Sequence, residues 1–192
     1  KDSPPEPAIR DDQGHDTFRA SVSGGRMGDR NFSELTLRPA YHDILDPPAG
    51  YRGGAQLQFL RLDARLYTDT ETNRVFTPYL EGGAGGSWQL APGTQAFAMA
   101  TADLEIDDDL GRGYDAAPGA DLGILHQNNQ FSLLGGVKTK AWIVSSQHRQ
   151  DQAYLEGNWH LERDFSLFGK FSREDHYDRY RSTWQLGLHA YF

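Results

Sequence analysis

The sequence contains no cysteine, and that absence limits the chemistry open to the chain. Disulfide bonds, thiolate catalysis and metal sites built on cysteine are all excluded. The chain also lacks a run of about 18 consecutive apolar residues, which a transmembrane helix needs. No segment shows the periodicity and caps of a helix of about ten residues or more. These absences leave an all-β chain as the class to consider.

The charges of the chain exclude one class of partner. The formal net charge is -8, and the lysines and arginines are scattered along the sequence. A chain with this charge and no basic cluster is not expected to bind nucleic acid. The 7 histidines show no metal-ligand spacing. We therefore expect neither a metal nor a cofactor.

The first residues differ in composition from the rest. Residues 1–14 are rich in proline and charge, which predicts a linker or an N-terminal arm. Residues 15–192 predict one β-barrel domain. Because the chain opens at Lys1 without a methionine or a signal peptide, we expect either a mature form or a domain of a longer protein.

The last segment shows the clearest strand pattern. From Tyr180 to Phe192, apolar or small side chains recur at every second position, with mostly polar ones between them. This alternation predicts a β-strand with one apolar face. Such a strand exceeds the roughly five or six residues usual in globular sheets and is about long enough to cross a bilayer at a tilt.

Similar alternation recurs along the chain, with turn residues between the segments. In residues 55–67 the pattern changes phase between Phe59 and Leu60, which predicts a β-bulge. The predicted strands include 18–23, 34–42, 55–67, 75–82, 96–107, 116–125, 131–143, 152–162, 165–173 and 180–192. The count is about ten, within a range of roughly eight to twelve.

So many strands leave exposed edges unless the sheet closes or divides. We predict an all-β fold: a closed, antiparallel, up-and-down β-barrel of the outer-membrane type, whose apolar face contacts membrane lipid. A soluble barrel gives the same alternation, but the strand length favours the membrane. The polar faces should then form a network of ion pairs in the lumen. Its predicted members are Glu34, Arg61, Asp63, Arg65, Glu81, Asp103, Glu105, Lys138, Lys140, Glu156 and Arg181.

The C-terminus carries a second membrane feature. Trp184, Leu186, Leu188 and Phe192 share the apolar face of the last strand. This pattern resembles the terminal signal by which the barrel-assembly machinery recognises outer-membrane barrels. The resemblance implies that this machinery is a partner during insertion.

Polar residues near the end of the second strand form the best candidate ligand site. They are Arg38, Tyr41, His42 and Asp43, with Asp46 nearby. One interpretation is a corner at the barrel rim that binds a lipid or a carboxylate. The alternative is a strand end whose loop is anchored by hydrogen bonds.

Residues 126–129, with the sequence His-Gln-Asn-Asn, resemble the histidine-containing strand of outer-membrane lipid A deacylases. Those enzymes use serine and histidine in an arrangement like a catalytic triad. Here glutamine or asparagine stands where the serine would be, which removes the nucleophile. The alternative is a polar hairpin turn, and we assign no catalytic residue.

A longer segment, residues 33–65, resembles part of a family of large Gram-negative envelope proteins. The matching words are Arg-Pro-Ala-Tyr-His-Asp (38–43), Leu-Asp-Pro (45–47), and residues 50–56; the segment 80–85 also fits. Members carry an N-terminal periplasmic domain of the Lnb-like, cysteine acyltransferase-like type and a C-terminal β-rich domain of unknown function. The resemblance implies that this chain is the C-terminal barrel, with the catalytic residues of the family upstream.

Three functions fit these observations. The first is a membrane anchor or scaffold for a periplasmic domain or partner, with its lumen filled by charged residues. The second is an enzyme that modifies lipids, similar to a lipid A deacylase, and the third is a soluble barrel that binds a hydrophobic ligand. We do not expect catalysis from this chain alone.

Overall fold

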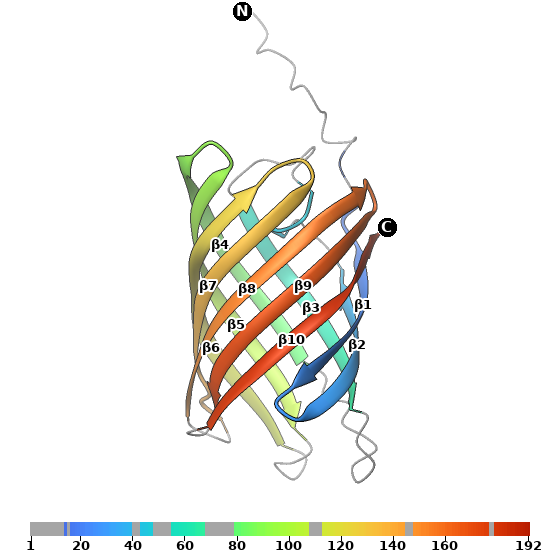
Figure 1. The fold of residues 1–192 in the computed structure, drawn as a ribbon. Helices are drawn as coiled ribbons and strands as arrows, with labels where there is room; N and C mark the ends of the chain where they lie inside the picture. Colours follow the sequence, from blue (N-terminus) through green and yellow to red (C-terminus); the bar gives the residue numbers. More distant parts are fainter. Residues whose placement is uncertain are drawn as a thin grey trace, which may run out of the picture.

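The computed structural model describes residues 14, 16–39, 43–47, 55–67, 79–107, 113–144, 148–176 and 179–192. Ten antiparallel strands form a closed barrel in which β1 pairs with both β2 and β10 (Figure 1). The strands are β1 (Arg19–Met27), β2 (Arg30–Arg38), β3 (Ala55–Tyr67), β4 (Tyr79–Ala91), β5 (Thr94–Asp107), β6 (Gly113–Gln127), β7 (Phe131–Ala141), β8 (Arg149–Glu162), β9 (Phe165–His176) and β10 (Arg179–Tyr191). The predicted fold class is confirmed.

Among the described residues, no helix combines the length and the apolar character needed to cross a membrane.

The two rims of the barrel differ. β1 begins and β10 ends at one rim, which we call the terminal rim, and the short connections 92–93, 128–130 and 163–164 lie there. Gly93 adopts a φ of 71°, which lets the two-residue connection between β4 and β5 close tightly. We call the opposite rim the loop rim.

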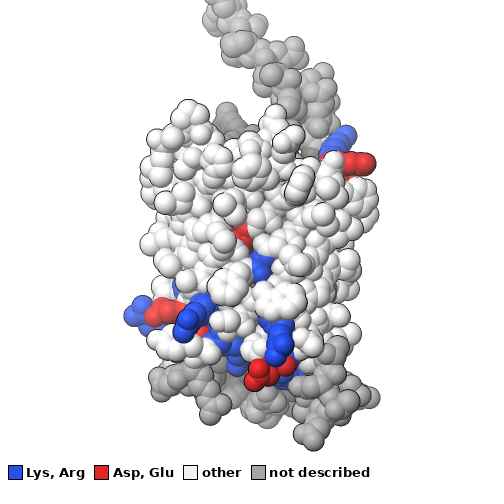
Figure 2. Space-filling view, in the orientation of Figure 1, with Lys and Arg blue, Asp and Glu red and all other residues white. Residues whose placement is uncertain are grey.

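The strands present apolar side chains outward and polar side chains inward. On β6, Leu122 is 52% exposed while the adjacent Asp121 is 7% exposed; on β7, Val137 is 57% exposed and Lys138 is 7% exposed. Figure 2 shows a broad uncharged surface, with the charged side chains gathered mainly near the loop rim. Because a soluble barrel would turn its charged faces to water, this arrangement suits a barrel surrounded by lipid.

The structure confirms the predicted bulge and corrects one strand end. The pairing of β3 with β4 shifts register between Gln58 and Arg61, where the alternation changes phase. The prediction of a strand through residue 42 is wrong, because β2 ends at Arg38. Pro39 follows directly, and proline cannot donate a ladder hydrogen bond. Tyr41 and His42 lie outside the described residues.

Strand β4 also differs from the prediction. The sequence predicted a strand at residues 75–82, whereas β4 runs from Tyr79 to Ala91; residues 75–78 lie outside the described residues. Four glycines between positions 82 and 86 interrupt the apolar pattern that predicts strands. They nevertheless pair in register with β5.

Candidate functional site

A short segment after β2 folds into the barrel at the terminal rim. We call residues 43–47 the plug segment. Its backbone carbonyl groups accept hydrogen bonds from lumen side chains: Gln127 donates to Asp46 O at 2.8 Å, and Asn158 donates to Leu45 O at 3.1 Å. Asp46 has no exposed surface. The plug segment therefore belongs to the interior of the barrel.

Two apolar side chains of the plug segment complete a small core inside the lumen. Ile44 and Leu45 pack with Phe97, Leu125 and Leu134. The sequence prediction placed only polar and charged groups in the lumen, and these inward-facing apolar side chains correct it. Phe97 and Leu134 lie near the starts of β5 and β7, and Leu125 lies near the end of β6. These strand ends are all at the terminal rim, so the core lies there. An apolar core removes water from this end of the lumen.

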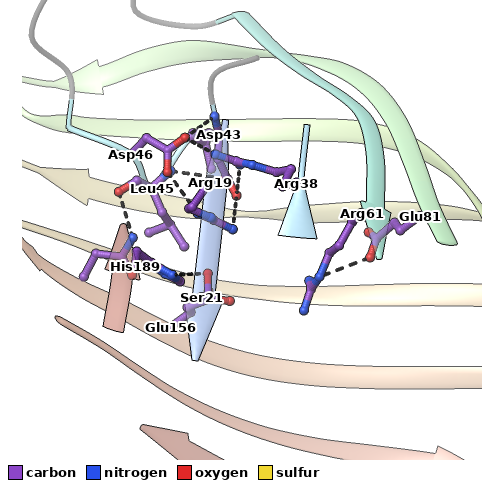
Figure 3. Close-up of polar contacts among 12 residues, drawn as sticks. Arg19, Ser21, Arg38, Asp43, Leu45, Asp46, Arg61, Glu81, Glu156 and His189 are labelled. Atoms are coloured by element: carbon purple, nitrogen blue, oxygen red, sulfur yellow. Dashed lines mark hydrogen bonds and ion pairs between the residues drawn. The ribbon is translucent and has the colours of Figure 1, made fainter. Parts of the chain in front are cut away.

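The plug segment also carries two carboxylates, and that of Asp46 binds residues of β1, β2 and β10. Arg19 Nη1 of β1 donates to Asp46 Oδ1 at 2.9 Å, and the hydroxyl of Tyr191 on β10 donates to the same oxygen at 2.9 Å. Arg38 at the end of β2 donates to Asp46 Oδ2. Figure 3 shows the two arginines reaching from neighbouring strands toward the aspartates. Both arginines are buried.

Asp43 is the second carboxylate. Its Oδ2 lies 2.7 Å from Arg38 Nη1 and 3.6 Å from Arg19 Nη2, and its backbone N–H donates to Asp46 Oδ2 at 2.8 Å. Arg19 and Arg38 are direct partners in the register of β1 and β2. Like charges directly opposite each other destabilise a sheet. The two carboxylates compensate the buried arginine pair.

The structure brings together only part of the ligand site predicted from sequence. Arg38 and Asp43 are in contact, whereas Tyr41 and His42 lie outside the described residues. Sequence reasoning missed Arg19 and Tyr191. Both lie on the polar faces of strands that the sequence predicts, so it was predictable that their side chains point into the lumen. Their meeting with Arg38 depends on β1 closing the barrel against β10, which no local pattern reveals.

Beyond the plug segment, toward the loop rim, the lumen contains a cavity of about 310 Å³ with ion pairs along its walls. We call it the chamber. The pairs include Arg65–Glu34 (2.6 Å), Arg61–Asp63 (3.0 Å), Lys138–Glu81, Lys140–Asp103 (3.0 Å), Lys170–Glu156 (3.3 Å) and Arg181–Glu174 (3.9 Å). Ten of the eleven predicted network residues are found in these pairs; Glu105 lies on β5, but its side chain is outside the described part. The charged side chains leave a cavity rather than filling the lumen.

Lys138 links several strands through this network. From β7 it pairs with Glu81 on β4 and lies 3.8 Å from Asp103 on β5. Lys140, two residues further along β7, lies 3.0 Å from the same Asp103. These carboxylates and ammonium groups are nearly buried, so each compensates a charge that would otherwise be costly in the interior.

The segment that resembles lipid A deacylases forms a turn. Asn128 Oδ1 accepts hydrogen bonds from the backbone N–H groups of Gln130 and Phe131, at 2.8 Å and 3.0 Å. Gln127 points into the lumen toward the plug segment, and His126 lies on the exposed side of β6. The arrangement is that of a polar hairpin turn.

A serine–histidine contact does occur elsewhere, inside the lumen. Ser132 Oγ lies 3.0 Å from His160 Nε2, and Ser166 Oγ lies 3.1 Å from His160 Nδ1. Both serines are at most 1% exposed. A lipid outside the barrel cannot reach them. Within the described ranges, no three histidine or acidic side chains are arranged to hold a metal ion.

Comparisons with known proteins agree with this architecture. The family model DUF7840, a domain of unknown function, matches residues 8–77 and 69–191. No curated protein matches the sequence significantly. The NanC porin is similar in structure, with a TM-score of 0.54 at 9% identity over 90% of this chain and 99% of that one. The KdgM porin gives 0.46 at 6% identity over 91% and 99%.

The likeness to NanC shows a shared fold. This chain forms a closed barrel of ten strands, and its fold is similar to that of the NanC porin. The fold and the apolar exterior support the location that the sequence predicts, the bacterial outer membrane.

Proposed function

The chain belongs to the DUF7840 family, and we propose that it serves as an outer-membrane anchor that holds a periplasmic domain or partner at the membrane. The observation that carries this proposal is the plug segment. It occupies the lumen at the terminal rim, with Asp46 fully buried among Arg19, Arg38 and Tyr191. A lumen partly filled at one rim by its own chain suits anchoring better than free passage of solutes.

The asymmetry of the rims supports an orientation for the anchor. In outer-membrane barrels, short turns face the periplasm and longer loops face outward. Three of the four connections at the terminal rim are short, the exception being 39–54, which contains the plug segment. The loop rim holds the longer connections 68–78, 108–112 and 142–148 besides the short ones at 28–29 and 177–178, so we place the terminal rim on the periplasmic side. A domain joined ahead of β1 would then lie in the periplasm. This placement agrees with the resemblance to the family with an Lnb-like N-terminal domain.

Insertion by the barrel-assembly machinery is part of the proposal. Trp184, Leu186 and Phe192 are 49%, 63% and 63% exposed. Phe192 also exchanges backbone hydrogen bonds with Phe18, the residue just before β1, at 2.8 Å and 3.2 Å. The end of the predicted signal thus lies beside the junction where β1 closes the barrel against β10.

A reporter enzyme fused ahead of the complete chain tests the anchor. We expect the reporter to fractionate with outer membranes and to resist protease added outside intact cells. Leu155→Arg should reduce this retention, because an arginine on the lipid side of a barrel costs about 2–4 kcal/mol at the bilayer midplane. His126→Ala should retain the reporter fully, because an anchor needs no catalytic histidine.

A reporter found in the soluble fraction would overturn the anchor. A reporter that external protease cleaves would overturn the orientation. Retention lost in His126→Ala, with the barrel still folded, would also count against the anchor, because an anchor needs no histidine at this exposed position.

A further inference from the structure

We propose that Arg19, Arg38 and Tyr191 form an anion-binding site, that Asp43 and Asp46 occupy it as tethered carboxylates, and that a soluble carboxylate or phosphate can bind there in their place. This inference goes beyond the anchor function and does not depend on it. It concerns what the arginine pair binds, whichever domain the barrel holds.

The donors at the site converge in the way that oxyanion recognition requires. Two guanidinium groups and one hydroxyl reach the same carboxylate of Asp46, and Arg38 also binds Asp43. The planar fork of arginine matches the spacing of oxygens in carboxylates and phosphates. Because Arg19 and Arg38 are direct cross-strand partners and are 5% and 1% exposed, the fold requires an anion between them.

The anions that now fill the site come from outside the sheet. Glu81 and Asp103 in the chamber lie on strands, where ladder hydrogen bonds hold their backbones. The plug segment lies between strands, and its backbone is held by side chains such as Gln127 and Asn158 and by the turn from Asp46 N to Asp43 O at 3.0 Å. The positions of its carboxylates therefore do not depend on ladder hydrogen bonds of the barrel wall.

The chamber provides access for a competing anion. Arg19, Asp43 and Arg61 all line the cavity of about 310 Å³. The side chain of Asp43 is 17% exposed, whereas that of Asp46 is fully buried. A small anion in the chamber would meet the Asp43 side of the site first. The volume is at the lower end of ligand pockets, which suits a compact solute.

Removing the tethered carboxylates tests the proposal. We would measure the temperature at which the complete chain in detergent loses its compact form on a gel, with citrate, inorganic phosphate or sodium chloride at matched ionic strength. The double variant Asp43→Asn/Asp46→Asn should unfold at a lower temperature than the wild type. Citrate or phosphate, but not chloride, should restore much of the loss by binding the folded state.

The apparent affinity for citrate or phosphate should rise about tenfold or more in the double variant, because the tether no longer competes for the site. Adding Arg19→Gln and Arg38→Gln to the double variant should abolish the response. If the double variant does not fold, Asp43→Asn alone frees one side of Arg38 and gives the same comparison.

The inference fails if the multivalent anions stabilise the asparagine variants no more than chloride does. It also fails if the variants without the arginines respond equally. Neither result bears on the anchor, since retention of a fused reporter is measured separately.

Discussion

Asp46→Ala is expected to destabilise the barrel by about 3–5 kcal/mol and to let ions pass through the lumen. The change removes one of the two carboxylates that compensate Arg19 and Arg38 and leaves Asp43 alone with both arginines. Removing one partner of a buried ion pair carries a penalty of this size. Tyr191 loses its acceptor as well. Denaturant unfolding in detergent measures the first effect, and conductance across a planar bilayer measures the second.

Asp151→Ala is the matched control. Asp151 also forms an ion pair with an arginine, Arg149, at 2.9 Å, but its side chain is 51% exposed. An exposed pair of this kind contributes about 0–1 kcal/mol. If both alanine variants lost similar stability, or if Asp46→Ala stayed closed, the role given to the plug segment would be wrong.

Lys138→Met, a change in the wall of the chamber, is expected to lower the stability of the barrel by a similar amount. Lys138 compensates Glu81 and lies near Asp103, and all three side chains are at most 9% exposed. Removing the ammonium group leaves buried carboxylates with less compensation, which costs about 3–5 kcal/mol. Denaturant unfolding of the complete chain measures the loss.

A double-mutant cycle separates this pairing from simple loss of packing. Glu81→Leu alone should also destabilise the barrel, because it leaves Lys138 with less compensation. The variant with both changes should lose less than the sum of the two, since an apolar pair can replace a buried ion pair at little cost. Strictly additive losses would contradict the pairing.

The alternating pattern of the strands made the architecture predictable. In β10, Leu186 and Leu188 alternate with Gln185 and His189, and the structure places the first pair outward and the second pair inward. A period of two residues is enough to assign faces. The bulge in β3 was predictable for the same reason, because a change of phase at Phe59 and Leu60 requires an extra residue in one strand.

The plug segment was not predictable by the same means. Residues 43–47 have no periodicity, and their place depends on Arg19, Arg38 and Tyr191, which come from both ends of the chain. The sequence did draw attention to Arg38, Asp43 and Asp46 as charged neighbours. That they would fold inward could not be read from a local pattern, because it depends on the closed barrel.

The apolar lumen core was missed for a related reason. Leu134 and Leu125 lie on inward faces that elsewhere carry charge, such as Lys138 and Asp121. Two leucines on a polar face look like exceptions when the strand is considered alone. In the structure, they form the core against which Leu45 of the plug segment packs.

The central claim is that the chain closes its own lumen. The most direct test is the conductance of the unaltered complete chain in a planar bilayer bathed in potassium chloride, with Asp46→Ala recorded in the same way as an open reference. The account predicts that the unaltered chain inserts without producing a steady current, while the variant conducts. A steady current through the unaltered chain, equal to that of the variant, would contradict the account.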